Sequence, residues 1–119
     1  MKIAVPQWQG RVSPVFDASG KFLLVDIENG SEICRVEVKM IYEDPLSRAR
    51  QLAFLGVDTL VCGVISSVFA AAVVSYGIKI IACTCGLVDE VLEAFLDDQL
   101  SDSRFLLPGC DKRLLGIWG

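Results

Sequence analysis

The chain has 119 residues, 53% of them hydrophobic and 22% charged, a composition typical of one globular domain with a substantial core. Its net charge of −4 argues against broad nucleic-acid binding, which requires a basic surface. Histidine is absent, so catalytic pairs and triads that need histidine are excluded, as are histidine-containing metal sites.

Neither a targeting segment nor a membrane span is visible. Residues 1–9 lack the basic segment and apolar stretch of a signal peptide. The longest apolar stretch, Val64–Val74, is too short to cross a bilayer. We therefore expect a cytoplasmic protein.

The N-terminal part predicts a strand followed by a loop. Lys2–Val5 is short and apolar, and the proline after it cannot donate to a strand ladder. Gln7–Phe16 has a glycine, a proline and no clean periodicity, which is typical of a loop. We expect Trp8 and Phe16 to pack over the core as a lid.

A hairpin signal follows. Lys21–Glu28 and Ser31–Lys39 are joined by Asn29-Gly30, the pair that a two-residue type I′ turn requires. The second strand alternates imperfectly, and Cys34 lies on its more apolar face, so we expect a half-exposed edge strand with Cys34 as a small core residue.

The next segment predicts a helix that starts at Asp44-Pro45, with the aspartate as N-cap, and ends near Gly56. Apolar residues follow helical spacing along it. The polar residues define the face expected to be solvated: Ser47, Arg48, Arg50 and Gln51.

Val57–Gly86 predicts a β-α-β unit. The apolar runs Thr59–Cys62 and Ile78–Cys83 flank Ser66–Tyr76, which is long enough for a crossover helix. A right-handed crossover places the carboxyl ends of both strands at the same edge of the sheet, the edge where open α/β sheets bind ligands.

An amphipathic helix is expected over Leu87–Leu96, and Ser101–Gly119 shows no reliable element. We therefore predict one domain over residues 1–100 and a C-terminal tail, partly mobile, over residues 101–119. The element order predicts an α/β fold with a mixed five-stranded sheet and helices on its faces.

Five cysteines, an odd number, argue against a disulfide framework and favour metal binding or redox chemistry. Cys62, Cys83 and Cys85 are expected at the same sheet edge, so they are the candidate metal ligands. If Cys83-Thr84-Cys85 is extended, its two thiols lie on one side with Cα atoms about 6.6 Å apart. That separation strains a disulfide but suits two thiolates on one metal or cluster. The alternative is that Cys62 and Cys83 are buried structural residues.

Candidate anion-binding groups lie at the same edge. Helices are expected to begin near Ser66 and just after Gly86, where unpaired N–H groups favour an anion. Gly63 and Gly86 allow backbone to approach a ligand closely, and Arg11 is the cation of the preceding loop. A metal-dependent nuclease is rejected, because the first strand has no carboxylate.

Three segments are similar to the dinitrogenase iron–molybdenum cofactor biosynthesis family, which includes NifX, the C-terminal domain of NifB-type proteins and the orange-protein group. They are MKIAVPQWQGRVSPVFDASGKFLLVDIENG, GVDTLVCGVISSVFAAAVVSYGIKII and GLVDEVLEAFLDDQL. The resemblance covers about Met1–Leu100. It implies a three-layer α/β/α ribonuclease-H-like fold. Some members use a histidine for the cofactor, and this chain has none.

The resemblance also implies a non-enzymatic protein that binds or carries an iron–sulfur or molybdenum–iron–sulfur cluster. The expected partners are the metallocluster or its precursor and a cluster-assembly or acceptor protein, with no nucleic acid and no membrane, and the expected state is a monomer or weak homodimer. Two alternatives stay open: a thiol redox module using Cys83 and Cys85, and an interaction domain with structural cysteines whose apolar tail, Phe105–Trp118, docks on a partner.

Overall fold

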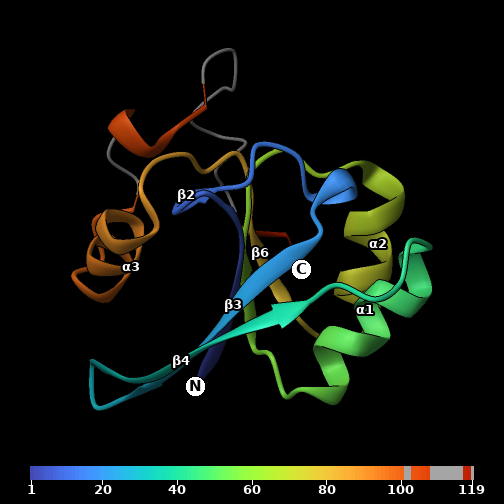
Figure 1. Cartoon of the computed structure of the whole chain (residues 1–119), viewed down its shortest axis with the longest axis horizontal. Helices are drawn as coiled ribbons and strands as arrows, with labels where there is room; N and C mark the ends of the chain where they lie inside the picture. Colours follow the sequence, from blue (N-terminus) through green and yellow to red (C-terminus); the bar gives the residue numbers. More distant parts are fainter. Residues whose placement is uncertain (101–102, 108–116, 119) are drawn as a thin grey trace.

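The fold is a mixed β-sheet with helices on both faces (Figure 1). The computed structural model describes residues 1–100, 103–107 and 117–118. The strands are β1 (Lys2–Trp8), β2 (Arg11–Val12), β3 (Lys21–Glu28), β4 (Ser31–Lys39), β5 (Thr59–Val61), β6 (Lys79–Ile81) and β7 (Ile117–Trp118). The helices are α1 (Pro45–Phe54), α2 (Ser67–Ser75) and α3 (Val88–Leu96), with short 3-10 turns η1 (Phe16–Ala18) and η2 (Ser103–Phe105).

The strand order is β4-β3-β1-β5-β6-β7, and β2 pairs with β1 outside this path. Strands β1, β5 and β6 are parallel, whereas β3, β4 and β7 are antiparallel to their neighbours. The expected five strands are therefore present, but the expected total is wrong, because the sheet also contains β2 and β7. Each of these strands has two residues, too few to show the alternation of apolar and polar residues by which a strand is predicted from sequence. The ribonuclease-H-like assignment stays a prediction.

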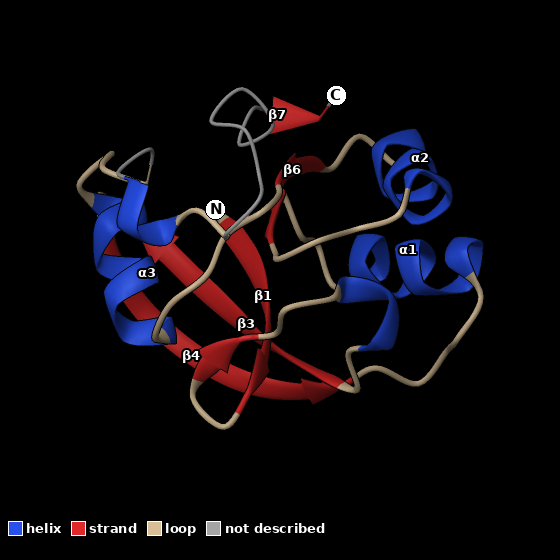
Figure 2. Ribbon diagram, turned by 90° about the horizontal axis from the view of Figure 1, so that it is seen from above, coloured by secondary structure: helices blue, strands red, loops and turns tan. Residues whose placement is uncertain are grey.

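Helices α1 and α2 cover one face of the sheet and α3 covers the other (Figure 2). Each face has its own core. Ala4, Phe16, Leu60 and Cys62 belong to the core under α1 and α2, and Val61 belongs to the core under α3. In the part of the chain described here, no helix is long and apolar enough to cross a membrane.

The predicted hairpin is confirmed with its bounds. Asn29 and Gly30 have φ angles of 52° and 76°, the left-handed values of a type I′ turn. The first strand, however, continues through Pro6 to Trp8. The parallel partner β5 is in register only with Ile3 and Ala4. Pro6 lies beyond these two residues. Its missing N–H therefore costs the parallel β1–β5 pairing no hydrogen bond.

The predicted loop over residues 7–16 contains regular structure. Trp8 pairs with Arg11 across a two-residue turn, and Gln9 and Gly10 both have positive φ there. Phe16 is fully buried, as expected of a lid residue, but Trp8 is 63% exposed, so that expectation is wrong for Trp8. The β1–β2 hairpin extends beyond the core, and its tip is exposed to solvent.

The expectation that Cys34 is a core residue is wrong, because Cys34 is exposed. It shares a face of β4 with Val38, which packs against the core under α1 and α2. Towards the hairpin tip, β4 extends past these helices (Figure 1), and Val36 is already 50% exposed.

Parts of the predicted tail join the fold. Phe105 is buried in the core under α3, and β7 pairs antiparallel to β6 through Ile81 and Ile117. Phe105 therefore shares the core under α3 with the family-like region, and β7 extends the sheet. Much of the tail, including Cys110, lies outside the described residues.

Candidate functional site at the carboxyl ends of the parallel strands

Cys62, Cys83 and Cys85 follow the ends of β5 and β6, at one edge of the sheet as expected. Backbone hydrogen bonds continue the ladder past the strands. Cys62 N donates to Ile81 O at 3.0 Å, Thr84 N donates to Cys62 O at 2.9 Å, and Cys83 N donates to Gly63 O at 2.9 Å. The two cysteine-containing segments are therefore held side by side by main-chain bonds, independently of any ligand.

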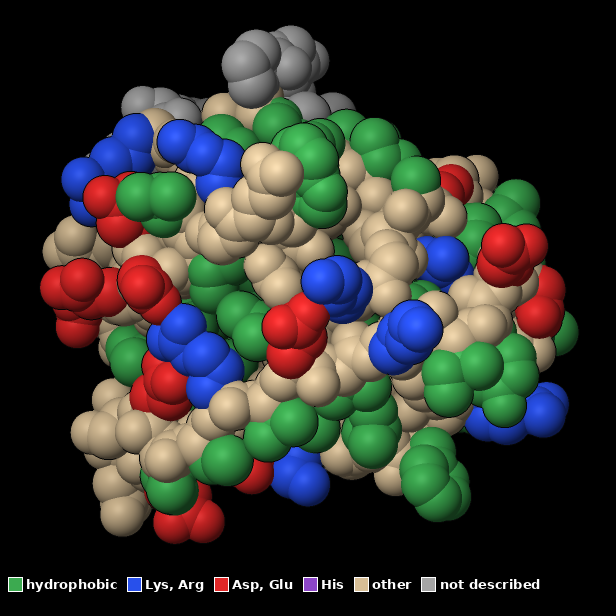
Figure 3. Space-filling model, viewed as in Figure 1, with side chains coloured by type: hydrophobic (Ala, Val, Ile, Leu, Met, Phe, Trp, Pro, Cys, Tyr) green, Lys and Arg blue, Asp and Glu red, His purple; other side chains and the backbone are tan. Residues whose placement is uncertain are grey.

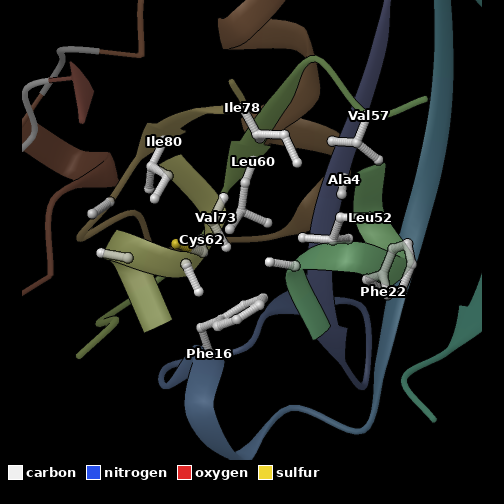
Figure 4. Close-up of a cluster of buried hydrophobic side chains, with 14 of the residues drawn as sticks. Ala4, Phe16, Phe22, Leu52, Val57, Leu60, Cys62, Val73, Ile78 and Ile80 are labelled. Carbon is white, nitrogen blue, oxygen red and sulfur yellow. The ribbon is translucent and has the colours of Figure 1, made fainter. Parts of the chain in front are cut away.

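Cys62 is a buried thiol. It is completely inaccessible and lies in the core with Val73 and Ile80 (Figure 4). Burial raises the pKa of its thiol well above the usual range, and the neighbouring Cys83 raises it further. Because the thiolate is the form that binds metal, the environment of Cys62 opposes its use as a ligand.

Cys83 departs from the extended geometry on which the two-thiol argument depends. Its φ angle is 60°, in the left-handed region that non-glycine residues adopt rarely. The chain turns there, so the alternation that would place Cys83 and Cys85 on one side does not hold. Cys83 is half-buried and packs against the core that contains Cys62.

Cys85 contacts a different part of the chain. Its N–H donates to Phe105 O at 2.8 Å, and its Sγ donates to Arg104 O at 3.7 Å. Leu107 N in turn donates to Cys83 O at 2.9 Å. Residues 104–107 therefore run beside Cys83-Thr84-Cys85 and form one wall of the edge.

Within the residues that the structure describes, no three Cys, Asp or Glu side chains are grouped as a metal site. The structure brings Cys62 and Cys83 together and directs Cys85 towards Arg104. The three-cysteine ligand set stays a hypothesis.

The candidate residues Gly63 and Gly86 have roles in packing the loops. A Cβ on Gly63 would overlap Pro14 O and would lie only 2.6 Å from Ser13 O. Gly63 thus lets the loop before Phe16 lie directly on the edge. Gly86 has a φ of 125° and accepts a 2.9 Å hydrogen bond from Val12 N, which docks the β1–β2 hairpin beside α3.

The candidate residues Ser66 and Arg11 lie at the starts of two different helices, Ser66 at α2 and Arg11 beside α3. Ser66 is the N-cap of α2, and its hydroxyl accepts from Phe69 N at 3.4 Å. Arg11 is exposed, and its backbone bridges to Leu87, the N-cap of α3.

Both helix N-termini at this edge already have partners from the chain itself. At α2, Ser66 N donates to the Asp17 carboxylate at 3.2 Å. At α3, Val88 N donates to Gly10 O at 2.9 Å, and the first turn contains Asp89 and Glu90. These carboxylates already supply the negative charge that helix N-termini favour, so neither terminus is an open anion site.

Asp17 and Arg48 organise the edge and were not identified from the sequence. Arg48 is buried, not solvated as expected. Its guanidinium donates to Tyr42 O at 2.6 Å and Phe16 O at 2.9 Å and lies 5.6 Å from the centre of the Phe69 ring. Burial lowers its pKa, and Asp17 opposes this shift. One sequence feature could have indicated that Arg48 is buried: it lies four residues before the buried Leu52, on the same face of α1.

The family model for the dinitrogenase iron-molybdenum cofactor matches residues 1–98. The chain belongs to this family. A relative, the protein MJ0580 of Methanocaldococcus jannaschii, is 28% identical over 109 residues, covering 84% of this chain and 89% of the relative.

Solved structures agree with this membership. The orange protein of Desulfovibrio gigas, in its apo form, is 27% identical with a TM-score of 0.69, covering 82% of this chain and 88% of that protein. The crystal structure of PH0822 has a TM-score of 0.78 at 23% identity, covering 83% of this chain and 93% of that chain. PH0822 supports the mixed α/β fold alone.

Proposed function

We propose that the chain is a cytoplasmic, non-enzymatic carrier of an anionic metal–sulfur cluster, of the iron–sulfur or molybdenum–iron–sulfur type, or of its precursor. The observation that supports this most directly is membership of a family associated with the nitrogenase cofactor, together with cysteines at the edge where open α/β sheets commonly bind ligands. The similarity to the orange protein, whose solved structure is an apo form, also supports a carrier that can be filled and emptied.

Within this proposal, Cys83 and Cys85 are the cluster ligands. Because the chain turns at Cys83, they bind different sides of the cluster and do not form a side-by-side pair, and Cys62 lies in the core behind Cys83. Cys83 and Cys85 are both partly accessible, whereas Cys62 is not. Arg104 contacts Cys85 through its backbone, because its carbonyl accepts from the Cys85 thiol, while its guanidinium lies 4.7 Å from the centre of the Phe105 ring.

Two protein thiols suit a cargo better than a resident cofactor. A structural metal site is usually closed by four protein ligands, whereas a cluster that brings its own sulfides needs fewer. Arg11, exposed next to the turn of the neighbouring hairpin, is a cation available to an anionic cluster. Partial ligation also allows transfer to an acceptor protein, the expected partner.

The test is anaerobic reconstitution with iron and sulfide, and separately with tetrathiomolybdate, followed by visible absorption and metal analysis after desalting. The wild-type chain is expected to retain metal, sulfide and charge-transfer absorption. A Cys83→Ser, Cys85→Ser double variant is expected to lose most of this signal. The matched control is Cys34→Ser, an exposed thiol on β4, which is expected to keep it.

Three outcomes are informative. Equal retention by the double variant and the control would disprove the ligand assignment. Failure of every protein to retain metal would disprove the carrier function. Loss of free thiols from Cys83 and Cys85 on mild oxidation, without metal retention, would favour the thiol redox module instead.

A further inference from the structure

Strand β4 forms an outer border of the sheet and pairs only with β3 among the described residues. We propose that two copies of the chain associate through β4, antiparallel and about a two-fold axis at Val36, so that one sheet continues through both copies. This inference is independent of the cluster-carrier function.

The open side of β4 follows from the hydrogen bonds on its other side. Met40 N donates to Gly20 O at 2.9 Å, so even-numbered residues of the regular strand direct their backbone groups towards β3. Backbone groups alternate along a strand, so Arg35 and Glu37 direct theirs outwards. In the described part of the chain, no hydrogen bond to these outward groups is found.

The open edge has two ends, and Val36 is midway between them. At one end, the register passes from Asp26–Cys34 to Ile27–Glu32 and leaves Ile33 as a bulge, which distorts the edge. At the other end, the Gln51 side chain occupies the outer backbone groups, donating to Lys39 O at 2.8 Å and accepting from Ile41 N at 3.2 Å.

The charges on β4 are self-complementary about this midpoint. A two-fold axis at Val36 places Arg35 opposite Glu37 of the second copy, and the symmetry makes this pair twice. An axis at Arg35 or at Glu37 would instead place like charges opposite each other. Opposite charges directly across an antiparallel pair are stabilising and like charges are destabilising, so the charge pattern selects the same centre as the strand geometry.

These pairs extend ion pairs already present on the α3 face. Glu37 lies 3.3 Å from Lys21 Nζ, and Arg35 binds Glu32 at 2.8 Å and Asp89 at 2.6 Å. When two copies pair, the charged side chains form a row whose charges alternate in sign. Lys21 and Glu37 of one copy are followed by Arg35 and Asp89 of the second copy. No like charges become adjacent in that row.

On the opposite face, apolar side chains border the same edge (Figure 3). Val36 is 50% exposed, and a hollow of about 510 Å³ begins at Val38, two residues further along the same face of β4. Its apolar lining residues are Val38, Ile41, Tyr42, Phe54 and Leu55. A second copy would bury Val36 against its own Val36 and place its Cys34 opposite Val38, at the rim of this hollow.

Disulfide trapping tests the axis. In a Cys34→Ser background, Val36→Cys places two thiols across the axis at a non-hydrogen-bonded pair, where Cα atoms are about 4.5 Å apart, within disulfide reach. The control is Val38→Cys in the same background, which faces position 34 of the second copy. Mild oxidation is expected to give at least about tenfold more covalent dimer from Val36→Cys than from the control.

Charge exchange tests the register without a cysteine, with sedimentation velocity over a concentration series as the readout and circular dichroism to verify folding. Arg35→Glu and Glu37→Lys should each weaken self-association by about tenfold, because each places two like-charge pairs across the axis. A mixture of the two variants should restore association, since every pair is then of opposite sign.

Three results would overturn the proposal: equal trapping by the two cysteine variants, no trapping above the background, or no recovery in the mixture. If β4 instead pairs with a strand of a different protein, the purified chain stays monomeric at every concentration and Val36→Cys is not trapped.

Discussion

Gly63 shows how one residue positions the edge of the sheet. The loop before Phe16 crosses Gly63 so closely that any Cβ would overlap the carbonyls of Ser13 and Pro14. The contact is made by main chain on both sides, since Val64 N donates to Pro14 O and Phe16 N donates to Val64 O, both at 2.8 Å. Relief would require backbone movement, not a rotamer change.

Gly63→Ala is therefore expected to destabilise the fold by about 2 kcal/mol, the range for overpacking a buried site. Urea denaturation followed by circular dichroism measures this change. Gly20→Ala is the matched control, because a Cβ there meets nothing within 4 Å. Equal stability of the two variants would show that the loop can move away without loss.

At the scale of elements, the start of α2 depends on a residue next to it in sequence and on one far away. Ser66 caps the helix through its hydroxyl, and its own N–H donates to Asp17 of η1. The helix interior is almost wholly apolar and contributes no charged residue to the first turn. The capping contacts therefore set both where α2 begins and how η1 docks against it.

Ser66→Ala is expected to lower the free energy of unfolding by about 1 kcal/mol, the usual effect of losing an N-cap. The measurement is thermal or urea denaturation. Ser67→Ala, at an exposed position one residue later, removes the same hydroxyl without a capping role and should change stability little. A larger loss from Ser67→Ala would contradict the assignment of the cap.

At the scale of the whole molecule, the core under α3 is completed by a segment beyond the region that the family model matches. Phe105 is 2% exposed and packs in that core, while its carbonyl accepts from Cys85 N. Residues 103–107 therefore contribute both to stability and to the wall beside Cys85.

Phe105→Ala is expected to cost about 3 kcal/mol, as for other large-to-small changes in a core. Phe54→Ala is the control, because Phe54 is 87% exposed on α1 and its truncation removes little buried surface. The melting temperatures of both variants measure the difference. Similar values would mean that residues 103–107 pack only loosely on the domain.

The sequence by itself determined the elements that depend on local chemistry. Asn29-Gly30 specifies a turn because few other pairs adopt positive φ at both positions. Asp44 caps α1 as predicted, since its carboxylate accepts from Ser47 N at 3.0 Å. The β-α-β unit and the shared edge of its strands follow from the handedness of the crossover, so the place of the candidate site was predictable.

Only the tertiary structure decided how the residues at that edge are arranged. The burial of Cys62, the left-handed turn at Cys83 and the contact of Cys85 with Arg104 all depend on segments distant in sequence. The exposure of Cys34 likewise depends on how far α1 and α2 reach along β4, which no strand pattern encodes. Residue spacing reports which residues share an element, whereas accessibility and thiol chemistry depend on what packs against that element.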